Sequence, residues 1–337
     1  MFRNQRTAAA TLLAGALILM VAFAASYVGA FHDPTPRHLP VAVVGTAEPL
    51  AGLPGEPLDV RAAADREAAL ALLDDREVYG VYDPAANRLY VASAANHAAA
   101  TALEQTIDRA LAEQDQPAVK VQDVKPLGET DPNGTSLFYV VIAWVFGGYF
   151  AAVLLGLVAG NRSRSRRLAG LRVGALAAFS VLGSLASLLV VRLAFDVLDG
   201  PFLALWAVGA LVVFATGIAS SGLQALAGMV GTGLVILLFV ILGNPAAGGA
   251  YARPLLPGFW GTVGGLLPPG AGVDLVRAVQ YFDGARVLGP ILVLAGWVVV
   301  GALLMLWRGG HPEPAVSIGS RARSGDRGRV ELVEAGV

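Results

Sequence analysis

The sequence contains no cysteine and only two lysines, Lys120 and Lys125. Without cysteine the chain cannot form disulfides, thiolate metal sites, iron–sulfur clusters or a cysteine nucleophile. Charged residues make up 15% of the chain, whereas soluble domains contain about 25%. Hydrophobic residues account for 55% of the chain, and the mean hydropathy is +0.63. This composition is typical of a membrane protein.

Six long apolar stretches provide candidate membrane-spanning segments. A bilayer core requires about 20 apolar residues in a helix, and charge within such a segment is costly. The six stretches are Ala8–Ala30, Leu137–Ala159, Val173–Phe195, Phe202–Ala219, Leu223–Leu242 and Leu288–Trp307. We therefore predict a polytopic α-helical membrane protein with six transmembrane helices, in which Ser220–Gly222 forms the turn between the fourth and fifth.

Charge is distributed unequally around these stretches. Arg3 and Arg6 precede the first stretch, the connection Asn161–Arg172 is basic, and further arginines follow the last stretch. Cytoplasmic loops are rich in Lys and Arg, so this pattern predicts that both termini are cytoplasmic. The frequent use of Ala, Gly and Arg suggests a bacterial source, and hence the bacterial cell (plasma) membrane.

The polar segment after the first stretch predicts an exported domain. Residues 31–135 hold eight basic and seventeen acidic residues, a net charge of −9. We divide the chain into an N-terminal transmembrane anchor (1–30), an extracytoplasmic α/β domain (31–135), a five-helix transmembrane domain (136–307) and a cytoplasmic disordered tail (308–337). The first stretch is long for a signal peptide and has a poor cleavage site, which favours an uncleaved anchor.

Local patterns predict the elements of this small α/β domain. They indicate strands at Leu39–Gly45, Glu77–Tyr82, Arg88–Ser93 and Ala118–Val124, and helices at Ala62–Asp74 and Ala98–Glu113, with Asp59 as a possible N-cap of the first helix. The second and third strands form a hairpin around Asp83–Asn87. His32, His38 and His97 are isolated, and Asp74, Asp75 and Glu77 are typical of a solvated helix end. We expect no catalytic, metal or cofactor site, and no nucleic-acid partner.

The predicted spans lack charge in their interiors. Arg192 lies near the end of its stretch, and Asp196 is a suitable partner four residues later. Because intramembrane ionisable residues mark proton and ion pathways, their absence disfavours an ion-coupled transporter. The chain also lacks a phosphate-binding loop of the form G-x-x-x-x-G-K-[ST]. Energy for any uphill movement must therefore come from another subunit.

Glycines at helical spacing indicate close packing of the helices or dimerisation.

Two segments are candidates for function. The first is the basic loop, with Arg162, Arg164, Arg166, Arg167 and Arg172, which would either couple the chain to a cytoplasmic partner or act as a topogenic cluster that contacts anionic lipid. The second is a re-entrant segment near residues 255–283, whose candidate gate residues are Pro257, Gly264, Gly265, Pro268, Pro269 and Gly270. Within it, Gly272–Asp283 predicts an amphipathic helix with Val273, Val276, Val279 and Gln280 toward one side and Arg277 on the other.

The order of these segments resembles that of permease subunits of type-2 ABC exporters, and more narrowly the YhgE/Pip-like branch of actinobacteria. The residues that carry the likeness are Glu77–Tyr82, Leu266–Pro269, Arg277, Tyr281–Gly284, Trp297 and Gly301. The resemblance implies a homo- or heterodimeric permease that is driven by a separate cytoplasmic ATPase and contacts it through Asn161–Arg172. Two features depart from the family: only Met1–Thr7 precede the first span, and the cytoplasmic loop is short and basic.

Three functional hypotheses follow. The first is a permease subunit that exports an amphipathic or hydrophobic substrate using ATP hydrolysed by a separate subunit. The second is a non-transporting envelope protein, which would serve as a receptor, adaptor or assembly factor through its outer domain. The third, a membrane-embedded enzyme acting on lipid, requires polar catalytic groups at membrane depth, where the spans offer only scattered Ser and Thr.

Overall fold

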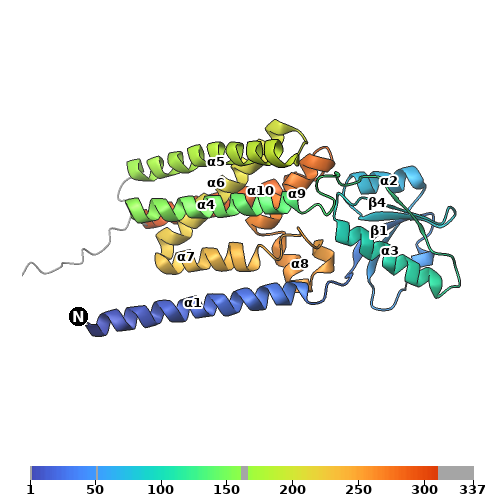
Figure 1. Ribbon diagram of the computed structural model, residues 1–337, viewed down its shortest axis with the longest axis horizontal. Helices are drawn as coiled ribbons and strands as arrows, with labels where there is room; N and C mark the ends of the chain where they lie inside the picture. The colour runs from blue at the N-terminus through green and yellow to red at the C-terminus, as the bar shows by residue number, and fades with distance from the viewer. Residues whose placement is uncertain (1, 51, 161–165, 310–337) are drawn as a thin grey trace, which may run out of the picture.

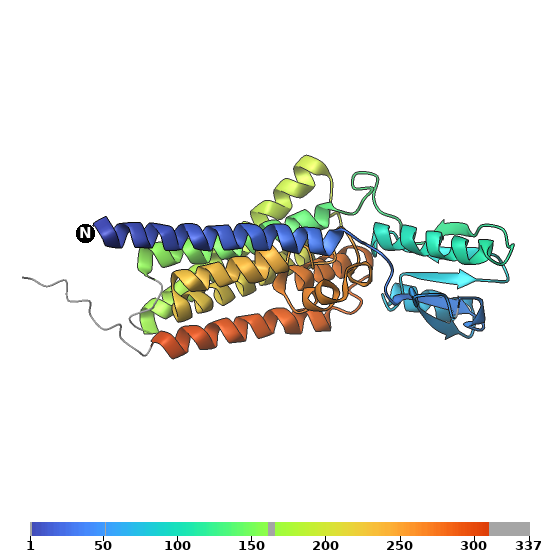
Figure 2. The same cartoon turned by 90° about the horizontal axis from the view of Figure 1, so that it is seen from below.

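The protein is elongated, with a bundle of long helices at one end and a small α/β domain at the other (Figure 1). The computed structural model describes residues 2–50, 52–160 and 166–309. Phe2 and Gly309, the two ends of the described chain, both lie at the end of the bundle away from the domain (Figure 2). The predicted disordered tail lies almost entirely outside the described residues.

Long apolar helices form the bundle. They are α1 (Phe2–Phe31), α4 (Ser136–Ala159), α5 (Arg166–Phe195), α6 (Phe202–Ala227) and α10 (Leu288–Gly309). Within the described residues, these five are long and apolar enough to cross a membrane. The structure therefore confirms a membrane-embedded helical protein.

Helix α6 lies at the centre of the bundle, where it packs against α10, α4 and α5. Glycine permits this close approach. A β-carbon at Gly222 would lie 2.5 Å from the carbonyl oxygen of Gly301, and one at Gly217 would lie 3.1 Å from Leu176. Small residues at helix contacts are the usual means of packing in lipid, where the hydrophobic effect does not hold helices together.

The predicted turn at Ser220–Gly222 is wrong. Both Ser220 and Ser221 are fully buried inside α6, which continues to Ala227. The helix ends at Gly228, whose φ of 57° and ψ of −124° are a backbone conformation that glycine adopts at little cost. Two serines do not break a helix whose surroundings supply no competing water, so the glycine decides where the chain turns.

The predicted fifth span, Leu223–Leu242, is shorter in the structure. It consists of α7 (Met229–Val235) and the π-helical segment η2 (Ile236–Leu242). Together these residues rise about 21 Å at the α-helical spacing, which is less than the roughly 30 Å of a bilayer core. They run back along the bundle and return the chain to the end that carries the domain (Figures 1 and 2).

Near the domain the chain forms two short helices instead of continuing as a span. They are α8 (Gly258–Gly264) and α9 (Pro268–Tyr281), and the 3-10 turn η3 (Arg253–Leu255) precedes them. Helix α9 packs against α4, α6 and α10. The expectation that Arg277 faces away from the packed side of this helix is wrong, because Arg277 is only 5% exposed. Because other helices pack around α9, the side of the helix that carries Arg277 is covered by protein instead of water.

The α/β domain contains a five-stranded sheet with the order β2-β1-β3-β4-β5 in the described residues. The strands are β1 (Leu39–Val44), β2 (Leu58–Ala63), β3 (Gly80–Asp83), β4 (Arg88–Val91) and β5 (Lys120–Asp123). The predicted hairpin is confirmed, since β3 and β4 are antiparallel, whereas the other neighbouring pairs are parallel.

Two helices cover the two faces of this sheet. Helix α3 (His97–Ala112) buries Leu103 and Ile107 against one face, and α2 (Arg66–Asp74) buries Leu73 against the other. A 3-10 turn, η1 (Glu48–Leu50), lies between β1 and β2. The predicted small α/β domain is therefore present in the structure.

The predicted helix over Ala62–Asp74 begins too early. Residues 58–63 form β2, in which Asp59 pairs with Pro40 of β1 instead of capping a helix. Helix α2 begins at Arg66, and its N-cap is Asp65, whose carboxylate accepts a hydrogen bond from the Ala68 amide at 2.8 Å. The alternating apolar positions of β2 are extended structure, and the carboxylate that follows it marks the start of the helix.

Helix α1 is anchored at its end near the domain. Trp260 of α8 donates a hydrogen bond from Nε1 to Ser26 Oγ at 3.2 Å, and Asn244 Nδ2 donates to the Tyr27 hydroxyl at 2.5 Å. Most of the remaining surface of α1 is exposed in the structure. The first span thus joins the bundle mainly through the segments around α8.

Candidate functional site

The domain and the bundle meet at the segments on either side of α8 and α9. The guanidinium of Arg37 donates to the Leu255 carbonyl at 3.0 Å. Asn96, the buried N-cap of α3, donates from Nδ2 to the Gly249 carbonyl at 3.2 Å. Ala252 and Leu255 also pack into the core of the domain. Residues far apart in the sequence therefore form one continuous junction.

Four charged residues lie at the centre of this junction. We call Arg76, Arg253, Arg277 and Asp274 the junction arginine cluster. Arg253 Nη2 lies 2.7 Å from Asp274 Oδ2, and Arg76 Nη2 lies 3.7 Å from Asp274 Oδ1. Arg76 also donates from Nη1 to the Asp274 carbonyl at 3.1 Å. Because Arg76 belongs to the domain and Asp274 to α9, this contact connects the two parts of the molecule.

The cluster contains more positive than negative charge. Arg277 is 5% exposed and donates from Nη1 to the Gly248 carbonyl at 3.2 Å. Neither Arg277 Nε nor Arg253 Nη1 has a hydrogen-bond partner among the described residues. The cluster thus has three guanidinium groups and one carboxylate, which pairs with Arg76 and Arg253. Buried guanidinium donors are costly when they are left unpaired.

Burial and mutual repulsion change the acidity of these arginines. Burial, together with the charge of Arg76, lowers the pKa of Arg277 to about 10, although Asp274 opposes the shift. Burial also lowers the pKa of Arg76. For Arg253, burial lowers the pKa, but the charge and hydrogen bond of Asp274 outweigh it, so that the pKa is raised overall. The single carboxylate is therefore the main source of compensating charge.

The acidic residues at the end of α2 form ion pairs instead of a catalytic pair. Glu77 lies 3.2 Å from Arg61 and 3.5 Å from Arg286, and Asp74 lies 3.3 Å from Lys125. Among the described residues, no group of three or more His, Asp or Glu side chains is placed to hold a metal ion.

The predicted gate residues lie around α8 and α9, and two of them, Gly264 and Gly270, are tightly packed. A β-carbon at Gly264 would collide with the Ala246 carbonyl, and one at Gly270 with the Gly264 carbonyl. Gly265 lies beside the guanidinium of Arg253. Pro257 is the residue before α8, while Pro268 and Pro269 begin α9, where proline is well tolerated. Their role as a gate stays a prediction.

Only part of the predicted coupling loop falls within the described residues. Arg162 and Arg164 lie outside them, as does the side chain of Arg166, whose backbone begins α5. Arg167 is exposed. Arg172 is not a loop residue: it lies in α5, is buried, and donates from Nη2 to the Gly160 carbonyl at 3.0 Å. It satisfies a carbonyl at the end of α4, which otherwise lacks an intrahelical partner.

The predicted pairing of Arg192 with Asp196 is wrong. Its guanidinium donates to the carbonyl oxygens of Leu198 and Gly200 and lies 5.3 Å from the centre of the Phe202 ring. The chain folds back after α5 and presents these carbonyls, so the arginine bonds to backbone instead of to the nearest carboxylate.

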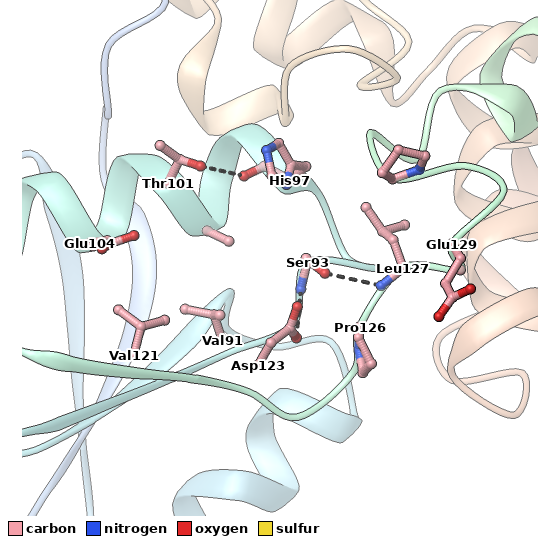
Figure 3. Close-up of a pocket in the computed structure, with 13 residues that line it drawn as sticks. Val91, Ser93, His97, Thr101, Glu104, Val121, Asp123, Pro126, Leu127 and Glu129 are labelled. Carbon is pink, nitrogen blue, oxygen red and sulfur yellow. Dashed lines mark hydrogen bonds between the residues drawn. The ribbon is translucent and has the colours of Figure 1, made fainter.

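The α/β domain also has an open pocket of about 370 Å³. It lies between α3, the β4–β5 edge and the segment that leads to α4 (Figure 3). Ser93 Oγ accepts a hydrogen bond from the Leu127 amide, and Asp123 Oδ1 accepts one from the Ser93 amide, each at 3.2 Å. These polar groups fix the path of the chain, whereas His97 and Glu104 contribute side chains to the pocket wall.

A buried polar group in α6 was not expected from the sequence. Ser220, Ser221 and Gln224 are at most 1% exposed, and their side-chain polar atoms have no hydrogen-bond partner among the described residues. The spacing of Gln224 from the two serines, four and three residues, was the available signal. It was missed because the serines were interpreted as a turn.

Comparison with the curated proteins gives no match, and comparison with the solved structures gives none either. One family model, described as "Protein of unknown function (DUF3533)", matches residues 80–303. The match runs from β3 through the junction and into α10. Because it covers more than half of the sequence, the chain belongs to the DUF3533 family.

Proposed function

We propose that the chain is the membrane-spanning subunit of an ABC-type exporter, which moves an amphipathic or hydrophobic substrate outward. In this proposal the energy comes from ATP hydrolysed by a separate cytoplasmic subunit, and the permease is a homo- or heterodimer in the bacterial cell membrane.

The position of α9 is the observation that supports this proposal best. The helix packs against α4, α6 and α10 of the bundle, and its Asp274 bonds to Arg76 of the domain. In this proposal, a shift of the bundle helices is passed to the outer domain through the short connection between Asp274 and Arg76. A simple membrane anchor has no need for such a connection.

The course of the chain supports six crossings. Helix α6 leads away from the domain, yet Gly249 and Leu255 contact the domain again. The segment Met229–Leu242 must therefore return the chain to the domain side. Its short length can be matched by local thinning of the bilayer or by neighbouring protein. In this arrangement the domain is extracytoplasmic and both termini are cytoplasmic.

Copurification tests the dependence on an ATPase. We would purify the tagged full chain in mild detergent from cells that express it naturally, and measure vanadate-sensitive ATP hydrolysis. We expect activity with the wild type, a loss of most of it in Arg167→Glu, and retention in the control Arg109→Glu, which reverses a charge on the outer domain. Equal hydrolysis by the wild type and Arg167→Glu would place the coupling surface elsewhere.

Reconstitution tests transport itself. The chain and its ATPase would be placed in vesicles containing a fluorescent phospholipid or a lipophilic dye. We expect movement only when both proteins and ATP are present. ATP hydrolysis without movement of either probe, or uphill movement by the chain alone, would contradict the proposal.

The pocket on the outer domain favours the second hypothesis, a non-transporting receptor or adaptor. Its volume of about 370 Å³ falls within the range of small-molecule sites. If this hypothesis is correct, we expect cells that carry a substitution of His97 or Glu104 to behave like cells that lack the chain. Transport assays of the wild type would then show no ATP-dependent movement.

A further inference from the structure

We propose that Arg76, Arg253 and Arg277 form a binding site for a phosphate group, in which the carboxylate of Asp274 offsets part of the positive charge and competes with the bound anion. This proposal does not depend on transport, because it rests only on the geometry and charge of the junction arginine cluster.

The first argument is the charge balance. Three guanidinium groups and one carboxylate carry a formal surplus of two positive charges, and Arg277 is almost fully enclosed. Buried charges in proteins are normally paired, because an uncompensated one is strongly destabilising. A doubly charged oxyanion would balance the cluster.

The second argument is the presence of unused donors. Arg277 Nε and Arg253 Nη1 are buried and have no partner among the described residues, although both belong to groups that bond elsewhere. An unpaired donor of this kind requires an explanation. Phosphate oxygens are well suited to it, since arginine presents its N–H groups in a planar fork that matches phosphate.

The third argument is access. The side chain of Arg253 is 29% exposed, so part of it reaches the surface although its Nη1 atom is buried. Gly248 and Gly265 flank this arginine, and a β-carbon at either position would lie within about 4 Å of its side chain. Gly265 therefore places no side chain of its own beside the guanidinium, and Gly248 places none beside the aliphatic part of the arginine.

The location narrows the source of the phosphate. The cluster lies where the bundle meets the domain. In the topology proposed above, this level corresponds to the phospholipid headgroups of the outer leaflet. The phosphate therefore belongs either to a lipid headgroup or to free phosphate from the outer solution.

The experiment measures binding to the full chain in neutral detergent. Radiolabelled inorganic phosphate is titrated at constant ionic strength, and phospholipid retained after purification is quantified by mass spectrometry. Saturable binding of phosphate supports a free-phosphate site, and stoichiometric retention of an anionic phospholipid supports a headgroup site. If neither ligand binds, the proposal is overturned.

Variants show whether any binding uses this cluster. We expect Arg277→Gln and Arg253→Gln to weaken binding by about tenfold or more, and the control Arg88→Gln, at the surface of β4, to leave it unchanged. We expect Asp274→Asn to bind several-fold more tightly, because it removes the carboxylate that repels the anion. A misfolded variant cannot show this gain. Equal affinity in all these variants, or weaker binding in Asp274→Asn, overturns the assignment.

Discussion

Among single residues, Asp274 connects the two parts of the molecule at the junction. Its carboxylate contacts Arg253 and Arg76, which come from different parts of the chain. The side chains that form these contacts are 15–29% exposed, so solvent screens their charges only partly. An interaction in such a position contributes more than a fully exposed ion pair.

We expect Asp274→Asn to lower the free energy of unfolding by about 1–3 kcal/mol, because two guanidinium groups lose their compensating charge. The measurement is thermal or chemical unfolding of the full chain in detergent. The matched control is Asp59→Asn, whose partner Arg61 is 40% exposed; here the expected loss is below about 1 kcal/mol. Equal losses in the two variants would show that the ion pairs of Asp274 contribute no more to stability than an exposed ion pair.

Gln224 presents the opposite case, a buried polar side chain whose removal should help stability. Its amide has no partner among the described residues and lies in the apolar centre of the bundle. We expect Gln224→Leu to raise the free energy of unfolding by about 1–2 kcal/mol, since the unsatisfied amide is removed. Unfolding in detergent provides the measurement.

A fall in stability for Gln224→Leu would show that the amide is satisfied by bound water or by another molecule. Increased stability together with lost transport would instead mark this polar group as part of the substrate path, because functional sites often retain costly polar groups.

Among the helices, the contact between α6 and α10 shows how glycine sets the packing of the bundle. The backbones meet at Gly222 and Gly301, where neither helix has room for a β-carbon. Gly296 lies in the same helix, α10, but a β-carbon there meets nothing within 4 Å. The two positions of α10 thus provide a direct comparison of a packed and an open glycine.

We expect Gly301→Val to destabilise the protein by about 1–3 kcal/mol, because the helices must separate to admit the side chain. Gly296→Val should change stability by less than about 0.5 kcal/mol. Thermal stability in the same detergent distinguishes them. Similar values for both variants would mean that α6 and α10 do not pack as closely as the glycine positions indicate.

The orientation of the whole molecule in the membrane can be tested cleanly because the chain has no cysteine. We expect Glu113→Cys, on the exposed end of α3, to react with a membrane-impermeant maleimide in intact cells. Ser317→Cys and Met229→Cys should react only after the membrane is permeabilised. Met229 lies just after the turn at Gly228 and is 70% exposed.

Each position tests a different part of the arrangement. Labelling of Met229→Cys in intact cells would contradict the return of the chain through Met229–Leu242. Labelling of Ser317→Cys in intact cells would place the C-terminus outside, against the positive-inside distribution of arginine. Lack of labelling at Glu113→Cys would contradict an extracytoplasmic domain.

Local and composition-driven features of this protein can be derived from its residues alone. Long uncharged runs require lipid, alternating apolar residues followed by turn residues define the β3–β4 hairpin, and apolar residues at helical spacing define α3. The family match includes the hairpin and α3 but assigns no activity. These features follow from interactions within about 20 neighbouring residues, which a linear pattern records.

The contacts between distant segments required three-dimensional packing. Arg76, Arg253 and Asp274 are separated by more than 20 residues along the chain at their closest, yet they meet in one cluster. The burial of Arg277 could not be predicted from its position on the helix, because the segments that cover this side of α9 are distant in the sequence. Likewise, the end of α6 depends on whether buried serines or Gly228 break the helix, and burial is a property of the assembled bundle. Hydropathy therefore defines the membrane character of this chain, while the partners of its few buried charges are set by the packing of the domain against the helices.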